Sequence, residues 1–170
     1  YYNLFLWYGK ICCPSVNLSM NRLCYYSGIA CRSYFDSNSI TCPLSYSTLA
    51  DNYAAGYTCV AFYLGGARCE IKSCNIIRNT QGTLNSEGII YTHGYLTIKD
   101  SCILENRADC IYCAYYSNYP ITLMNCTVDS ISNNGYPTIK NTVTKSFILA
   151  LNHMSTQNCH SEYDSAGYLT

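Results

Sequence analysis

The stretch Ile71-Lys-Ser-Cys-Asn-Ile-Ile-Arg-Asn79 recurs along the chain, and its repetition decides the fold. Copies that match it position for position occupy residues 44–52 and 98–106. Weaker copies occupy 13–21 and 149–156, and a copy that we read as one residue shorter occupies 123–130. The copies end at residues 21, 52, 79, 106, 130 and 156, which gives steps of 31, 27, 27, 24 and 26. A period in this range is typical of a solenoid, whose repeats bury their apolar sides only by stacking on each other.

Within each repeat, apolar runs of strand length alternate with Gly, Asn and Ser, and no repeat offers ten residues of helical periodicity. Ser, Thr, Tyr, Asn and Cys are abundant, and this composition favours strands over helices. A second set of short strands follows the first set, at 28–31, 58–63, 88–92, 110–114, 136–140 and 167–170, with 4–8 as the rung before them. We therefore predict an all-β protein that forms a single-stranded parallel β-helix of about six turns.

The length of 170 residues indicates one domain with a continuous core. We expect residues 1–170 to be a single β-helix domain. Its parts are an irregular first turn at 1–36, regular turns at 37–156 and a degraded last turn at 157–170.

Charge argues against several classes of partner. Ten basic and ten acidic residues balance to a net charge of zero, and they are scattered without runs. This pattern predicts no nucleic-acid partner and no electrostatic membrane partner. No apolar run is long enough to span a bilayer and no secretory signal is present, so we expect a mature product or a fragment.

Stacking of the repeats predicts a file of polar side chains at one corner of the coil. Equivalent positions hold Asn21, Asn52, Asn79, Asn106 and Ser130. Side-chain amides at the strand spacing can each donate to and accept from the next, so a ladder is expected. The preceding position holds Asp51, Arg78, Glu105 and Asp129, which predicts that Arg78 lies between two carboxylates on adjacent turns.

Thirteen cysteines leave two readings open. One is a secreted protein with a mixture of disulfides and free thiols, and the other is a chain whose thiols are mostly buried as small hydrophobic groups. Cys110-Ile-Tyr-Cys113 has the spacing of metal and redox motifs. Strand alternation would point its two cysteines to opposite faces, so we predict no metal site and no cofactor there.

An enzyme of this fold would need carboxylates clustered on one face of neighbouring turns. Asp51, Asp100, Asp109 and Asp129 fall in different columns of the repeat, and His93 shares no column with another histidine. We therefore predict no catalytic residues.

Two kinds of surface residue are candidates for contact with other molecules. Asn17 and Asn125 begin N-glycosylation sequons. Four tyrosines that lie close in sequence form a candidate interaction surface, namely Tyr112, Tyr115, Tyr116 and Tyr119. Their rings would offer stacking faces to sugars or to partner proteins.

The motifs Leu96-Thr-Ile-Lys-Asp-Ser-Cys102 and Ile121-Thr-Leu-Met-Asn-Cys126 resemble right-handed parallel β-helix proteins of the pectin-lyase-like type. The ending at 145–164 is similar to a family of Cys- and Asn-rich surface proteins of trichomonad-type parasitic flagellates. The resemblance implies a right-handed coil and a secreted or cell-surface location, and it brings no catalytic residues with it.

The function that we expect is a non-enzymatic, extracellular or cell-surface structural protein. The ends of a β-helix carry unpaired backbone groups, so head-to-tail self-association into fibrils is expected. The alternative is a surface adhesin or glycan-binding module that uses the tyrosines for a glycan or host-surface partner. The third hypothesis is a polysaccharide lyase or hydrolase.

Overall fold

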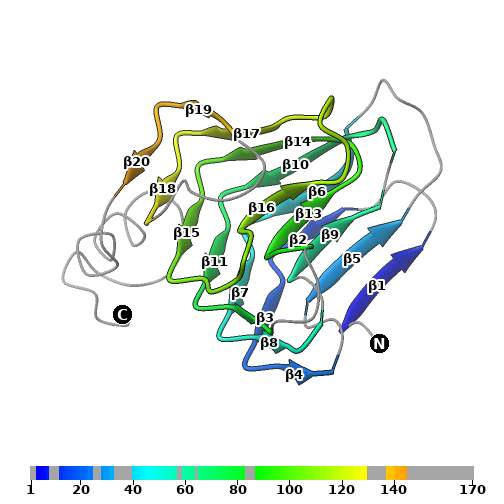
Figure 1. Ribbon diagram of the computed structural model, residues 1–170, viewed down its shortest axis with the longest axis vertical. Helices are drawn as coiled ribbons and strands as arrows, with labels where there is room; N and C mark the ends of the chain where they lie inside the picture. Colours follow the sequence, from blue (N-terminus) through cyan, green and yellow to red (C-terminus); the bar gives the residue numbers. More distant parts are fainter. Residues whose placement is uncertain are drawn as a thin grey trace.

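The computed structural model describes residues 3–7, 12–24, 28–32, 40–56, 59–63, 65–82, 87–129 and 137–144. Within these ranges every regular element is a strand, and every strand pairing is parallel. Strands that are far apart in the sequence lie side by side on successive turns (Figure 1). The predicted all-β parallel solenoid is therefore confirmed.

The strands form four sheets, which we name A to D. Sheet A contains β1 (Leu4–Trp7), β5 (Ile29–Arg32), β9 (Val60–Phe62), β13 (Ile90–Thr92) and β16 (Tyr112–Ala114). Sheet B contains β2 (Cys13–Pro14), β6 (Ile40–Ser45), β10 (Arg68–Lys72), β14 (Tyr95–Lys99), β17 (Ile121–Met124) and β19 (Thr138–Lys140). Sheet C contains β3 (Asn17–Ser19), β7 (Thr48–Ala50), β11 (Asn75–Ile77), β15 (Cys102–Leu104), β18 (Thr127–Val128) and β20 (Val143–Thr144). The small sheet D contains β4 (Arg22–Leu23), β8 (Tyr53–Ala54) and β12 (Thr80–Gln81).

The chain visits sheets B, C, D and A in that order and then returns to B. Complete turns begin at β2, β6, β10 and β14, and in the last of these a single bridge between Thr80 and Arg107 takes the place of a D strand. The described coil thus has about four turns, fewer than the six predicted. One reason is that Thr138–Lys140, predicted as a short strand of the second set, pairs with β17 in sheet B. The predicted segments at 149–156 and 167–170 lie outside the described residues.

Each copy of the long repeat contains two strands with a corner between them. Ser73 joins β10 to β11 and has a φ of 52°, in the left-handed region. Residues at two corners of the coil share this conformation. They are Ser15, Tyr46, Ser73, Asp100, Asn125 and Asn141 between sheets B and C, and Met20, Asp51, Arg78 and Glu105 after sheet C. None of these residues is glycine, so each costs ~1–2 kcal/mol of backbone strain that the surrounding ladders must offset.

Aliphatic side chains stack in columns inside the coil. Ile71 pairs with Leu44 on one side and Ile98 on the other, and Ile76 pairs in the same way with its neighbours in sheet C. These side chains are buried in one continuous core. Each contributes ~1.5–3 kcal/mol by leaving water, so this core supplies much of the stability of the coil.

The copy at 123–130 differs from the prediction that it is one residue shorter. Leu96 pairs with Ile121 and Ile103 pairs with Val128, so the offset is 25 residues at both points (121 − 96 and 128 − 103). No residue is missing between β17 and β18, and the turn is shortened elsewhere.

Candidate functional site

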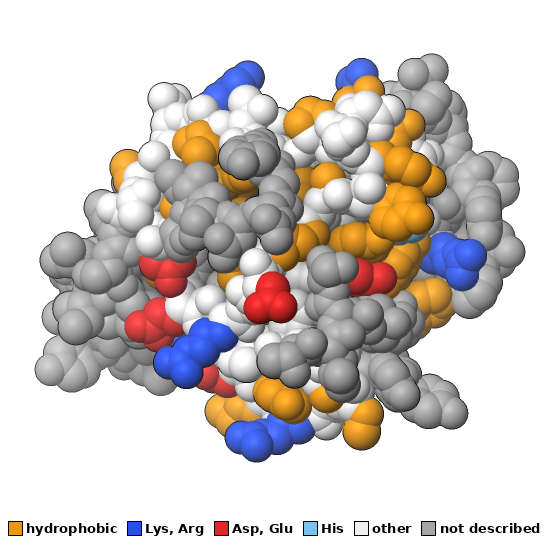
Figure 2. All heavy atoms as spheres, in the orientation of Figure 1, with side chains coloured by type: hydrophobic (Ala, Val, Ile, Leu, Met, Phe, Trp, Pro, Cys, Tyr) orange, Lys and Arg blue, Asp and Glu red, His pale blue; other side chains and the backbone are white. Residues whose placement is uncertain are grey.

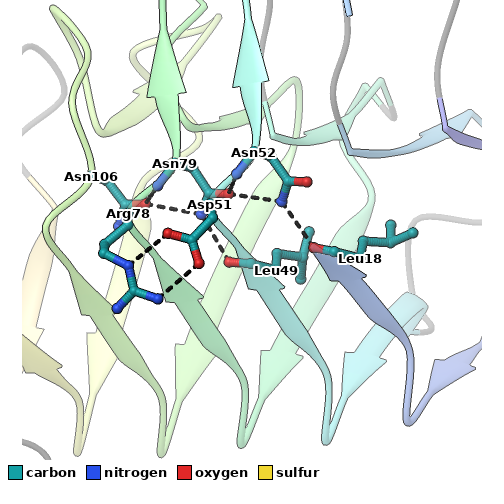
Figure 3. A network of polar contacts seen from close by, with 7 residues as sticks. All are labelled: Leu18, Leu49, Asp51, Asn52, Arg78, Asn79 and Asn106. Carbon is teal, nitrogen blue, oxygen red and sulfur yellow. Dashed lines mark hydrogen bonds and ion pairs between the residues drawn. The ribbon is translucent and has the colours of Figure 1, made fainter. Parts of the chain in front are cut away.

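The four asparagines predicted to form a file lie one above another where the chain leaves sheet C. Figure 3 shows three of them, Asn52, Asn79 and Asn106. The side-chain nitrogen of Asn21 donates to Oδ1 of Asn52 over 2.9 Å. Asn52 donates in the same way to Asn79 over 2.9 Å, and Asn79 donates to Asn106 over 3.0 Å. The amides therefore form a continuous ladder along the axis.

Each interior side-chain amide of the ladder has both its oxygen and its nitrogen in hydrogen bonds. Oδ1 of Asn79 accepts from both the backbone and the side-chain nitrogen of Asn52. Its Nδ2 also donates to the carbonyl of Leu49, over 2.8 Å. Only 1% of the surface of Asn79 is exposed. A buried amide whose bonding groups are satisfied fixes the alignment of the turns, because a slipped turn would leave the amide without partners. Ser130, the fifth predicted member, lies outside the described residues.

The residues that precede the asparagines form an ion pair on the surface. Nε and Nη2 of Arg78 lie 2.6 and 2.8 Å from the two carboxylate oxygens of Asp51 (Figure 3). The hydrogen bond from Arg78 lowers the pKa of Asp51, and the nearby charge of Glu105 adds to the raised pKa of Arg78. Because both partners are more than a third exposed, solvent screens the pair, and it is worth at most ~1 kcal/mol.

A second ladder follows the corner between sheets B and C, and sequence reasoning missed it. Its members are small side chains that reach back to a backbone carbonyl two residues earlier, namely Ser47, Cys74, Ser101, Cys126 and Thr142. Oγ of Ser101 also accepts from the backbone nitrogen of Cys74 on the previous turn, over 3.1 Å. The signal in the sequence was the alternation of Ser and Cys at the fourth position of each repeat.

Both ends of the described coil carry strand edges that pair on one side only. At one end these are β1, β2, β3 and β4, and at the other end β19 and β20. Ile139 continues the column of Ile98 and Leu123, yet 40% of its surface is exposed, and Val143 is 41% exposed. At the opposite end Leu4, Leu6, Val16 and Leu18 are only partly buried against the core. Each end of the described coil thus combines strand edges that no other described strand pairs with apolar side chains that are partly or largely exposed.

Aromatic rings gather on the side of the coil where sheet A meets sheet B. We define the aromatic surface cluster as seven residues linked by ring contacts, namely Tyr63, Tyr91, His93, Tyr95, Tyr115, Tyr116 and Tyr119. On the space-filling surface, hydrophobic side chains gather towards the right of the view, with acidic and basic groups beside them (Figure 2). The cluster therefore forms a real patch of the surface.

The prediction of an interaction surface is partly corrected by this geometry. Tyr115 and Tyr116 are 59% and 46% exposed, and Tyr119 contacts both Tyr116 and Tyr95. Tyr112 does not belong to the surface, because its side chain points into the core and is fully buried. Strand alternation in β16 places it beside Ile90, and burial raises its pKa.

His93 is an integral member of the cluster, although the sequence suggested an ordinary polar position. Its ring stacks on Tyr115 at 4.6 Å, and its Nε2 lies 3.1 Å from the hydroxyl of Tyr91. Burial, and then the charge of Arg32, lower the pKa of His93 below its ordinary value of 6.5. The hydroxyl of Tyr63 donates to Glu87, whose own pKa is raised by burial. Alignment of the long repeat did not reveal this group, because its members follow the sheet A strands, whose spacing along the sequence is irregular.

The prediction that the two cysteines of the CxxC motif point to opposite faces is also corrected. Cys110 and Cys113 form a disulfide, and both are buried. Cys110 precedes the first residue of β16, so the strand alternation used in the prediction does not apply to it. Burial raises the pKa of Cys59 to about 12 and that of Cys13 to about 11, so these two thiols stay protonated at neutral pH. They act as small core residues.

Both sequon asparagines have exposed side chains. Asn17 accepts a hydrogen bond from the hydroxyl of Ser19, and Asn125 donates to Asp100 over 3.2 Å from the corner between sheets B and C. Their exposure is compatible with modification.

Within the described ranges, no three His, Cys, Asp or Glu side chains come together as metal ligands. Over the same residues the structure contains no helix long and apolar enough to cross a membrane. Comparison with protein-family models, with curated proteins and with solved structures found no match for this chain.

Proposed function

We propose that this chain is a non-enzymatic structural protein whose solenoids associate end to end outside the cell or at its surface. The observation that supports this most directly is the character of the two ends. Each offers edges of parallel strands that no other described strand pairs, together with apolar side chains of the interior columns, Leu18 at one end and Ile139 at the other. Such edges are templates for further strand pairing.

The polarity of the asparagine ladder favours a head-to-tail arrangement. Each amide from Asn21 to Asn79 donates one hydrogen to the amide of the later turn, while Asn52, Asn79 and Asn106 donate a second one to a carbonyl of the earlier turn. Oδ1 of Asn21 therefore receives no donor from the described residues. A second copy added at this end would place its β19 and β20 beside β2 and β3 and extend sheets B and C in the same parallel direction.

The extracellular or cell-surface location rests on two supports. Disulfides such as the one between Cys110 and Cys113 persist in oxidising compartments. The resemblance of residues 96–102 and 121–126 to pectin-lyase-like proteins, and of 145–164 to surface proteins of trichomonad-type flagellates, points the same way. We take the right-handed coil from this resemblance, and most parallel crossovers share that hand.

Sedimentation velocity over a range of protein concentrations, together with electron microscopy, tests the proposal. The wild-type protein should form elongated particles whose length grows with concentration. Placing charge on the exposed apolar end in Ile139→Lys and Val143→Lys should shift the protein to monomers. Thr138→Lys, on an exposed residue of the same strand that precedes Ile139, is the matched control and should still associate. Monomers at every concentration for the wild type, with an intact fold by circular dichroism, would refute end-to-end association.

A further inference from the structure

Three members of the aromatic surface cluster form a column parallel to the axis of the coil. Tyr63, His93 and Tyr115 each follow the last residue of a sheet A strand, and those last residues pair with one another. The backbone pairing continues through the column, since the nitrogens of His93 and Tyr115 donate to the carbonyls of Phe62 and Thr92. Ring centroids are 5.3 Å apart from Tyr63 to His93 and 4.6 Å apart from His93 to Tyr115. The rings therefore step along the rod at about the strand spacing.

The backbone holds this column rigidly, while its outer end stays accessible. Tyr91, which underlies the column, packs in a second buried cluster with Ala61 and Cys113. Tyr115 lies perpendicular to Tyr116, with an angle of 89° between the ring planes. Two exposed rings at right angles offer contact faces in two directions. Rigid aromatic groups of this kind bind with little loss of conformational entropy.

The polar groups of the cluster carry almost no net charge. His93 is neutral at pH 7 because its pKa is lowered, and Glu87 and Arg32 contribute one negative and one positive group. Arg32 lies in the same column, one turn before Tyr63. Phenolic hydroxyls supply both donors and acceptors. Arg68 lies beside Tyr95 on the neighbouring strand, so the described charged groups next to the rings are two arginines and one glutamate, a balance too small to favour a polyanion over a neutral ligand.

A flat ligand with apolar faces and a rim of uncharged hydroxyls matches these features best. Pyranose sugars have that form, since the ring C–H groups stack on aromatic faces and the hydroxyls bond to polar side chains at their edges. The repeat of rings along the axis suits a chain of such units better than a single one.

We propose that the aromatic surface cluster binds an uncharged oligosaccharide that lies along the column from Tyr63 to Tyr115. Tyr115 and Tyr116 provide the stacking faces, and Glu87, whose side chain is partly exposed, accepts from a sugar hydroxyl. This site does not depend on end-to-end association, because it lies on the side of the rod.

Isothermal titration with neutral hexasaccharides tests the site, with cellohexaose, chitohexaose and mannohexaose as the neutral probes and hexagalacturonate as the acidic probe. At least one neutral probe should bind, and more tightly than hexagalacturonate does. Replacing both exposed rings in Y115S/Y116S should weaken that binding by roughly tenfold or more, because the variant loses two ring-stacking contacts and each of them contributes to the affinity. Tyr115→Phe keeps the ring and should bind within ~3-fold of wild type, a change of less than one hydrogen bond.

Tyr53→Ser is the matched control, because Tyr53 is 42% exposed but lies on sheet D, outside the cluster. It should bind like wild type. Circular dichroism of each variant should match that of the wild type, since Tyr115 and Tyr116 are exposed. Failure of all the neutral probes to bind, tighter binding of hexagalacturonate, or unchanged affinity in Y115S/Y116S would each overturn the proposal.

Discussion

Sheets B and C on one side of the coil and sheet A on the other are built by the same turns, yet they follow different rules. In sheet B the step from Leu44 to Ile71 and from Ile71 to Ile98 is 27 residues each time. In sheet A the step from Val60 to Ile90 is 30 residues, and the next one, to Tyr112, is 22. The differences in turn length are therefore taken up by the connections on either side of sheet A.

The side of the coil formed by sheets B and C therefore fixes how the turns align, whereas the residues around sheet A are free to differ between turns and to serve a binding function. We call the side formed by sheets B and C the ladder side, because both hydrogen-bonded ladders lie at its corners. It repeats the same residue types at the same places, because each amide or small hydroxyl must meet its equivalent on the next turn. Around sheet A no such requirement holds, and equivalent positions carry Arg32, Tyr63, His93 and Tyr115. We expect stability to depend mainly on the first side and binding on the second.

The largest expected effect is on the asparagine ladder. Asn79→Ala removes a buried amide that makes four side-chain contacts, and it leaves groups of Asn52 and Leu49 without partners. We expect a loss of ~3 kcal/mol in the free energy of unfolding, measured by urea denaturation. The control Asn125→Ala removes an exposed amide and should cost less than ~1 kcal/mol. Equal losses in the two variants would contradict the special role of the ladder.

The next largest effect is expected at Gly88, which lies in close contact with Cys110 and Cys113. Gly88 has a φ of 74°, and a methyl group there would meet the carbonyl of Cys110 and lie 2.8 Å from Sγ of Cys113. Gly88→Ala should therefore cost more than ~1 kcal/mol and should perturb the tyrosine signals in near-UV circular dichroism. Gly65→Ala, with nothing within 4 Å of the added methyl group, is the control and should unfold at the wild-type urea concentration or above. A stable Gly88→Ala variant would show that β13 and β16 are not so closely packed.

A smaller effect is expected from the disulfide. Because the Cys110–Cys113 bond closes a very short loop, its reduction should lower the free energy of unfolding by at most ~2 kcal/mol. Cys113 packs against Tyr91, so the change should be confined to the sheet A side. Hydrogen exchange with and without reductant checks this, and faster exchange at Asn52 and Asn79 after reduction would be the contrary result.

The smallest effect concerns the surface ion pair. Arg78→Gln should cost less than ~1 kcal/mol at pH 7, since the pair is exposed. The lowered pKa of Asp51 means that this stabilisation is present above the ordinary value of 3.8 and is lost as the pH falls through the folded-state pKa. The difference between wild type and variant should thus vanish in acid and shrink in 1 M salt. A difference that persists under both conditions would point to packing of the arginine stem instead.

The sequence predicted the ladder side well and the sheet A side poorly, for a physical reason. Stacked equivalents must be alike on the ladder side, so alignment of copies located Asn52, Asn79 and Asn106 and the aliphatic columns. The buried position of Tyr112 and the bond between Cys110 and Cys113 depend on where β16 begins, which no repeat specifies. The small sheet D escaped notice because its strands are only two residues long.

The most direct test of the stacked coil is a nuclear Overhauser experiment on isotope-labelled protein. The side-chain amide protons of Asn52 should show contacts with those of Asn79, and Asn79 with Asn106, although each pair is 27 residues apart in the sequence. If these asparagines instead show contacts only with residues near them in the sequence, the turns do not stack in this register and the account fails.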